Sequence, residues 1–120
     1  MIAIELDRDT VAAGEFVTAR VRWAADHDRA ARQILAALEW RTEGKGNTAR
    51  GIGRAMRFVP PRRDDRAAVF PVHLMVPHEG PVSFAGELTA IVWHLRVRVD
   101  QRGPDEIAEV AFRVTLRHHC

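Results

Sequence analysis

The sequence predicts an all-β protein, an antiparallel β-sandwich of about seven to nine strands. Apolar and polar residues alternate with period two in several segments, as they do in strands that have one buried and one wet face. Turn-forming residues separate these segments at spacings that suit short connections. The chain has 120 residues, 47% of them hydrophobic, which is enough for one domain with a single core. We expect that domain to cover residues 1–117, followed by a short tail, 118–120.

The first two expected strands lie near the N-terminus. Residues 2–6 alternate apolar and other residues, and a connection over residues 7–14 ends in the turn at Gly14. A second strand is predicted for residues 15–23. Its inward set would be Val17, Ala19, Val21 and Trp23.

Residues 28–41 allow two interpretations. Their apolar positions fit one face of a helix, with Asp28 as the N-cap, and alanine, leucine, glutamine and arginine are good helix formers. The same segment also alternates with period two. As a strand, it would direct one set inward: Ile34, Ala36, Leu38 and Trp40. Because every neighbouring element reads as β and tertiary context overrides local propensity, we interpret residues 32–42 as a strand.

Three further strands are expected in the second half of the chain, over residues 67–76, 91–100 and 109–116. The alternation is longest in the middle one. Its inward set would be Ile91, Trp93, Leu95, Val97 and Val99. Its outward set would be Val92, His94, Arg96, Arg98 and Asp100, so we expect His94 to be exposed.

With the strands placed, three segments resemble the arrestin-fold family. Residues 9–21 are similar to its opening, where a turn ending in Gly-Glu leads into a strand, and residues 38–46 are similar to a strand and glycine turn of bacterial members. Pro81, Ser83, Phe84 and Gly86 ahead of the strand containing Trp93 resemble a Pro-Ser-x-x-Gly segment. The resemblance implies an immunoglobulin-like, arrestin-like β-sandwich that acts by docking to other proteins. Familiar arrestins pair two such sandwiches, whereas this chain has the length of one, so their interdomain activation does not carry over.

Positive charge is concentrated over residues 41–66, where eight basic residues face three acidic ones in a chain of net charge +2. Such a segment could steer an acidic partner or an anionic lipid surface, or it could be a set of solvated edge charges. The candidate binding residues are Arg50, Arg54, Arg57, Arg62 and Arg63. Nucleic acid is not expected as a partner, because no exposed aromatic residue is interleaved with these arginines for base stacking.

The sequence lacks the motifs of an enzyme, and we expect no catalytic residue, cofactor site or metal site. Ser83 is the only serine and is not in a Gly-x-Ser-x-Gly elbow, while Cys120 is the last residue and has no fixed base beside it. The tail of His118, His119 and Cys120 has metal-binding atoms but no fixed geometry.

Three apolar residues in the outward register, Phe16, Leu35 and Met75, are candidate contacts for a protein partner or a second copy of the chain. We therefore expect a non-catalytic interaction or scaffold module that docks through a sheet face or edge, with homodimerisation left open. The alternative is a module that binds anions or acidic lipid surfaces through residues 41–66. No apolar run is long enough to span a bilayer and no signal-peptide pattern precedes the first strand, so a cytoplasmic protein is expected, with peripheral membrane contact left open.

Overall fold

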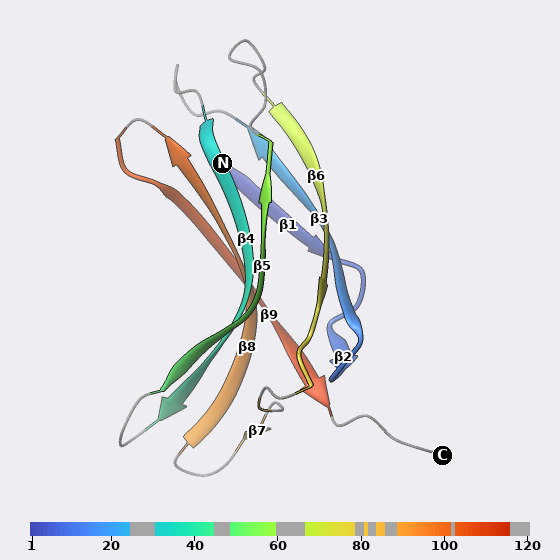
Figure 1. The fold of residues 1–120 in the computed structure, drawn as a ribbon. Helices are drawn as coiled ribbons and strands as arrows, with labels where there is room; N and C mark the ends of the chain where they lie inside the picture. Colours follow the sequence, from blue (N-terminus) through green and yellow to red (C-terminus); the bar gives the residue numbers. More distant parts are fainter. Residues whose placement is uncertain are drawn as a thin grey trace.

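The computed structural model describes residues 1–24, 31–44, 49–59, 67–78, 81, 84–85, 89–101 and 103–115. These residues form two packed β-sheets and no helix, which confirms the predicted all-β sandwich (Figure 1). Within them, therefore, no helix exists that could cross a membrane. The strands are β1 (Ile2–Leu6), β2 (Thr10–Ala12), β3 (Phe16–Ala24), β4 (Ala31–Gly44), β5 (Arg50–Phe58), β6 (Ala67–Met75), β7 (Phe84–Ala85), β8 (Thr89–Gln101) and β9 (Glu106–Thr115).

The two sheets differ in size. The smaller sheet has the antiparallel order β1-β3-β6. The larger sheet has the order β2-β9-β8-β4-β5, with the short β7 beside β8 and with β2 parallel to β9. Among the described residues, β5 and β6 are therefore edge strands. Pro71 lies within β6, where a residue without an N–H is tolerated because β6 pairs on one side only in this part of the chain.

The ambiguous segment is a strand wherever the structure describes it. β4 occupies the interior of the larger sheet, paired with β5 on one side and β8 on the other. Ile34, Ala36 and Leu38 are fully buried, as the period-two interpretation predicts. The helical alternative is therefore wrong for residues 31–41, because pairing on both sides outweighs the local preference for helix. Residues 28–30 lie outside the described part of the chain.

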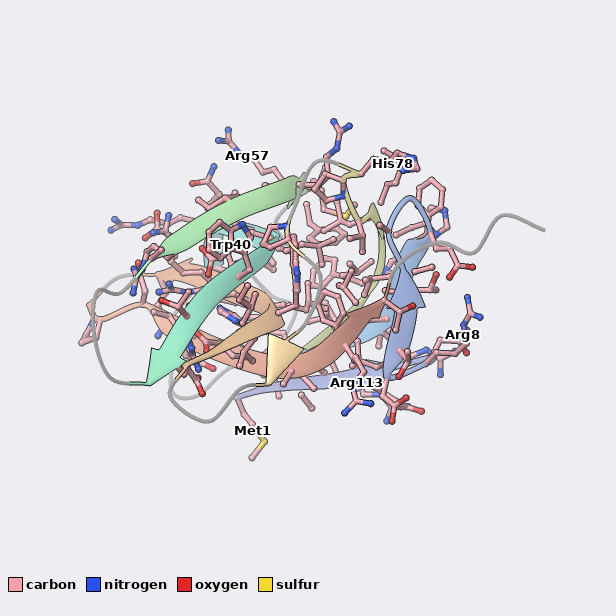
Figure 2. All side chains as sticks on the ribbon, turned by 90° about the horizontal axis from the view of Figure 1, so that it is seen from below. Met1, Arg8, Trp40, Arg57, His78 and Arg113 are labelled. Carbon is pink, nitrogen blue, oxygen red and sulfur yellow. The ribbon has the colours of Figure 1, made fainter. Side chains whose placement is uncertain are left out.

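The core lies between the two sheets and is built from the inward residues of β3, β4, β6, β8 and β9 (Figure 2). Trp93, Leu95, Val97 and Val99 of β8 are fully buried, as expected. The Trp93 indole Nε1–H donates a hydrogen bond of 2.6 Å to the carbonyl oxygen of Pro81, which satisfies its polar atom. Charged side chains such as those of Arg8, Arg57 and Arg113 extend away from the core in Figure 2.

β5 carries a β-bulge. Ala55 pairs with Ala37 and Ile52 pairs with Glu39, so two β5 residues, Gly53 and Arg54, lie opposite the single β4 residue Leu38. The sequence did not predict this strand, because the bulge breaks the period-two alternation in its middle.

Candidate ligand pocket on the larger sheet

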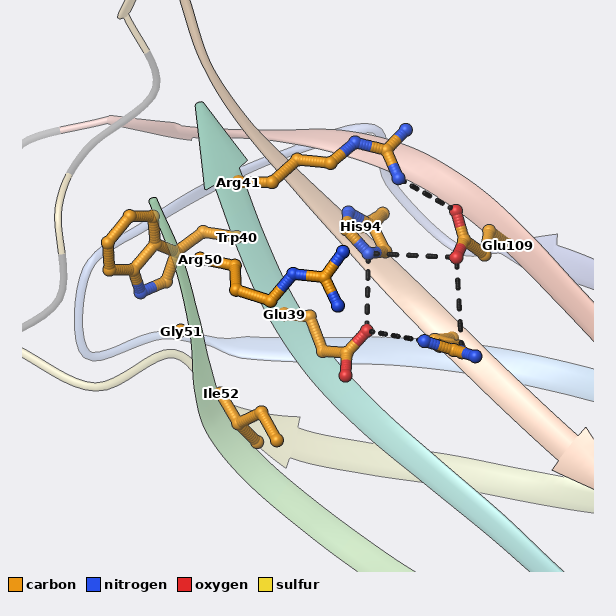
Figure 3. Close-up of a pocket in the computed structure, with 9 residues that line it drawn as sticks. Glu39, Trp40, Arg41, Arg50, Gly51, Ile52, His94 and Glu109 are labelled. Atoms are coloured by element: carbon orange, nitrogen blue, oxygen red, sulfur yellow. Dashed lines mark hydrogen bonds and ion pairs between the residues drawn. The ribbon is translucent and has the colours of Figure 1, made fainter. Parts of the chain in front are cut away.

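A pocket of about 410 Å³ opens on the face of the larger sheet that points away from the core (Figure 3). Three neighbouring strands, β4, β8 and β9, supply charged side chains in the outward register, and the start of β5 supplies one wall. The lining residues are Glu39, Trp40, Arg41, Arg50, Gly51, Ile52, His94, Arg96 and Glu109.

The floor of the pocket is a ring of four side chains, Glu39 of β4, His94 and Arg96 of β8, and Glu109 of β9 (Figure 3). His94 Nε2 lies 3.3 Å from Glu39 Oε2 and 3.9 Å from Glu109 Oε1. Arg96 lies on the other side of the same two oxygens, with Nη1 at 3.7 Å from Glu39 and Nε at 3.9 Å from Glu109. The register creates this ring, since Glu39 pairs with His94 and Arg96 pairs with Glu109. Each carboxylate is thus shared between the histidine and the arginine.

The prediction that His94 is exposed is wrong, because the residue is only 5% exposed. The period-two pattern assigned His94 to the correct face. However, the long side chains that neighbouring strands place beside it cover the imidazole, and one strand read alone does not show them. His94 Nδ1 has no hydrogen-bond partner among the described residues. The histidine is therefore a buried polar group with one unsatisfied nitrogen, which is uncommon in a native structure.

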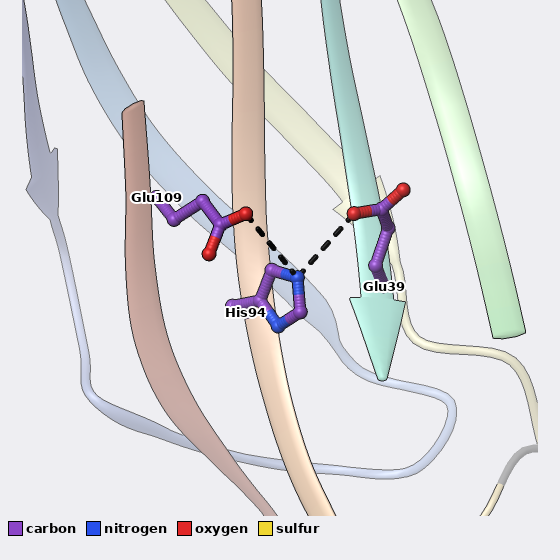
Figure 4. A group of neighbouring side chains, drawn as sticks. All are labelled: Glu39, His94 and Glu109. Atoms are coloured by element: carbon purple, nitrogen blue, oxygen red, sulfur yellow. Dashed lines mark ion pairs between the residues drawn. The ribbon is translucent and has the colours of Figure 1, made fainter. Parts of the chain in front are cut away.

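Glu39, His94 and Glu109 also meet the simplest geometric condition for a metal site, since their donor atoms lie within 4.8 Å of one another (Figure 4). The surrounding charges do not fit a cation. Arg96 already lies against both carboxylates, and Arg41 and Arg50 add two more positive charges to the lining. We interpret the two carboxylates as ion-pair partners of these arginines.

The arginines of the pocket differ in how well they are paired. Arg41 donates hydrogen bonds to Glu43 Oε1 at 3.0 Å and to Glu109 Oε2 at 3.3 Å. The hydrogen bond to Glu43 is the main cause that raises the pKa of Arg41, which keeps its guanidinium charged. Arg50, in contrast, has no ion pair or hydrogen bond to any residue that the structure describes. Figure 3 shows its side chain directed over the pocket.

The remaining wall of the pocket lies along β4 and the start of β5, where Trp40 and Gly51 are register partners on the core side of the sheet and Ile52 lies on the outward side. A Cβ atom on Gly51 would lie 2.4 Å from Trp40 Nε1, so the indole occupies the space that any larger residue would need. Ile52 is 68% exposed on the outward face of the sheet. Three arginines and two glutamates line the pocket, and Glu43, outside the lining, pairs with Arg41. The pocket therefore combines one arginine that has no ion-pair partner among the described residues with one exposed apolar side chain, Ile52.

Comparisons with known proteins support the fold and little more. No family model matches the chain, and the comparison with curated proteins found no relative. Among solved structures, the chain is similar to Spo0M, a sporulation control protein from Bacillus subtilis, with a TM-score of 0.74 and 19% sequence identity. The match covers 98% of this chain and 49% of that protein.

The chain has an arrestin-like β-sandwich fold. This confirms the fold that the sequence resemblance implied. At 19% identity the likeness shows the fold alone, and the chain spans about half the length of Spo0M.

The structure separates the predicted arginine candidates. Arg50 lines the pocket, whereas Arg54 and Arg57 lie further along β5, outside the lining. Arg62 and Arg63 lie outside the described residues. Sequence reasoning did not select the residues that form the ring, because Glu39, His94 and Glu109 come from three different strands. The signal that could have found them is the pairing register of the long strands, which brings these positions side by side.

The apolar candidates are divided between the two sheets. Phe16 and Met75 are register partners on the outward face of the smaller sheet, where Phe16 stacks on His73 with ring centroids 4.1 Å apart. Leu35 lies on the outward face of the larger sheet, paired with Arg57 and Arg98. The three residues therefore do not form one patch. A role of either face in binding a partner or a second copy stays a prediction.

Proposed function

We propose that this domain is a non-catalytic interaction module that binds an acidic side chain of a partner protein in the pocket of the larger sheet. The observation that carries this proposal is Arg50, a charged side chain that lines the pocket without an ion-pair partner among the described residues. A guanidinium binds a carboxylate through two parallel hydrogen bonds, which gives both affinity and orientation.

The rest of the lining supports the same ligand chemistry. Glu39 and Glu109 are already shared between His94, Arg96 and Arg41, so they leave the charge of Arg50 to be neutralised from outside. Ile52 offers apolar contact beside that charge, whereas Trp40 pairs with the buried Trp93 and packs against the core. An acidic residue within a polypeptide, with an aliphatic residue near it, would use both features.

The proposal places the domain in a regulatory or adaptor role and not among enzymes. The pocket holds one histidine and two carboxylates, which are the groups that acid-base catalysis would use. Here His94 contacts both carboxylates, and Arg96 contacts the same two carboxylates. Spo0M, which shares the fold, is described as a sporulation control protein, and a control function suits a module without catalytic groups. A cytoplasmic location belongs to the same proposal.

A capped peptide tests this function. The probe is acetyl-Ser-Thr-Glu-Thr-Ile-Thr-Ser-amide, whose only charge is the glutamate, and its control has glutamine in place of glutamate. Isothermal titration calorimetry of the wild-type protein should show the glutamate peptide binding at least about tenfold more tightly than the glutamine peptide.

Two matched variants locate the effect on the protein. Arg50→Gln should lose about tenfold in affinity for the glutamate peptide, whereas Arg54→Gln, an exposed arginine of the same strand outside the pocket, should change it less than about twofold. Equal affinity of wild-type protein for the two peptides would overturn the proposed function.

A second candidate is binding to an acidic lipid surface. It is favoured by one observation, that β5 carries Arg50, Arg54 and Arg57 and no acidic residue. Cosedimentation with phosphatidylserine vesicles tests it. Replacing all three arginines with glutamine should abolish salt-sensitive binding to these vesicles, and binding that survives the replacement would exclude this candidate.

A further inference from the structure

β5 is the last strand of the larger sheet, and its position leaves one side without a partner strand among the described residues. It pairs with β4 on the other side. A strand in this position presents every second backbone N–H and C=O group outward, and such a row can pair with another extended segment. The pocket adjoins this row, since Arg50, Gly51 and Ile52 of β5 line it.

Only the first part of β5 is suited to receive such a segment. In Figure 1 the start of β5 lies beside the end of β4, and β6 lies on the opposite side of the picture. The second part approaches β6, because Phe58 and Phe70 pack with ring centroids 5.1 Å apart. The bulge at Gly53 and Arg54 separates the two parts and interrupts the ladder between them.

The side chains of the first part have a defined chemistry. Arg50 and Ile52 pair with Arg41 and Glu39 in the register, so both lie on the outward face of the sheet, two residues apart. Both are exposed, and β5 contains no acidic residue. A strand added beside them would place its own residues at positions i and i+2 next to these two side chains.

We propose that the partner segment binds as an extra β-strand along Arg50–Ile52, with a carboxylate and an aliphatic side chain two residues apart facing Arg50 and Ile52. This inference rests on the proposed function and adds the binding mode and the pattern of the ligand. Backbone hydrogen bonds to β5 would supply affinity that is independent of sequence, and the pocket would supply selectivity. Adjacent acidic and aliphatic residues would not serve, because neighbours along a strand point to opposite faces.

The competing explanation is that Arg50, Arg54 and the bulge protect this edge from pairing with other chains, a common use of charge and bulges at sheet edges. In that case the backbone groups of β5 stay solvated whatever binds in the pocket. The two explanations therefore differ in what happens to the β5 amides when a ligand is present.

Amide hydrogen exchange, followed by NMR, tests the binding mode with the same probe peptide used above. At a free peptide concentration ten times the dissociation constant, the outward N–H groups between residues 50 and 53 should exchange about tenfold more slowly. The N–H groups of β5 that already pair with β4 serve as the internal control, since their exchange should change less.

Modified peptides give a second readout. A peptide of the same composition with glutamate and isoleucine adjacent should bind about tenfold more weakly. N-methylation should also act unequally, because only one alternating set of peptide amides can face β5. Two methylated peptides are compared. One carries methyl groups on the backbone nitrogens of glutamate and isoleucine, and the other carries one on the nitrogen of the threonine between them. One of these two peptides should lose binding, and the other should still bind.

The outcomes separate this inference from the proposed function. Binding that depends on Arg50 but protects no β5 amide, and that treats both N-methylated peptides alike, would overturn strand addition and leave the carboxylate pocket standing. Failure of every peptide to bind, with or without binding to acidic vesicles, would overturn both. Selective protection together with unequal N-methylation effects would support both.

Discussion

At the scale of single residues, His94 shows how the site departs from what its own strand predicts. The outward register and a polar side chain indicated exposure, yet His94 is almost completely buried. Glu39 and Glu109 reach it from the strands on either side. The face on which a residue lies follows from its own strand, whereas its burial depends on the length of side chains on the neighbouring strands.

The unsatisfied Nδ1 of His94 leads to a prediction about stability. His94→Leu should keep or raise the free energy of unfolding, by up to about 1 kcal/mol, because it removes a buried polar atom that has no hydrogen-bond partner among the described residues. Glu39 and Glu109 would retain their contacts with Arg96. Urea denaturation measures the effect, with Leu95→Ala as the contrasting core variant, expected to lose about 2–5 kcal/mol.

A loss of more than about 2 kcal/mol in His94→Leu would contradict this interpretation. It would mean that the contact between His94 and Glu39 stabilises the fold by more than the unsatisfied nitrogen costs.

At the scale of elements, long regular strands were predictable and short or irregular ones were not. β3, β6 and β9 alternate in burial over nine residues or more, and in β8 the predicted inward residues Trp93, Leu95, Val97 and Val99 are buried. β2 and β7 have three and two residues, too few for a period to be visible. β5 is long enough, but its bulge, its glycines and its arginines hide the pattern.

The contact between β4 and β5 depends on a glycine. Gly51→Ala should displace the Trp40 indole, because the added Cβ would lie 2.4 Å from its Nε1. We expect a loss of roughly 1–3 kcal/mol in the free energy of unfolding, measured by urea denaturation. The neighbouring Ile52→Ala is the control, expected to change stability by less than about 0.5 kcal/mol because the side chain is mostly exposed.

The same variant reports on the pocket. Because Trp40 and Gly51 both line it, Gly51→Ala should also weaken binding of the glutamate peptide several-fold. Unchanged stability together with unchanged affinity would show that Trp40 is free to move and does not shape the wall.

At the scale of the whole molecule, the sequence indicated where charge collects but not how it is used. The basic surplus over residues 41–66 is partly neutralised in the structure by acidic residues from elsewhere, since Arg41 reaches Glu109 of β9. Of the three arginines that line the pocket, Arg50 has no ion-pair partner in the part of the chain that the structure describes. The sequence alone gave no reason to prefer Arg50 over its neighbours, because that choice depends on which strands lie side by side.

The exposed position of Arg50 predicts a dependence on salt. Raising the salt concentration from 50 to 200 mM should weaken binding of the glutamate peptide by roughly two- to fivefold, since solvent screens charges at an exposed pocket. The glutamine peptide should show little change, and calorimetry at the two concentrations measures both. Equal salt effects on the two peptides would show that the carboxylate is not in contact with a charged group.

The most direct test of the central claim is a double-mutant cycle between Arg50 and the peptide carboxylate. Four dissociation constants are measured, for wild-type protein and Arg50→Gln, each with the glutamate and the glutamine peptide. A direct contact predicts a coupling free energy of about 1 kcal/mol or more. Arg50→Gln should then have little effect on binding of the glutamine peptide, and the two peptides should bind the Arg50→Gln variant about equally. Additive effects, with a coupling below about 0.3 kcal/mol, would contradict the claim that Arg50 binds the acidic group of the partner.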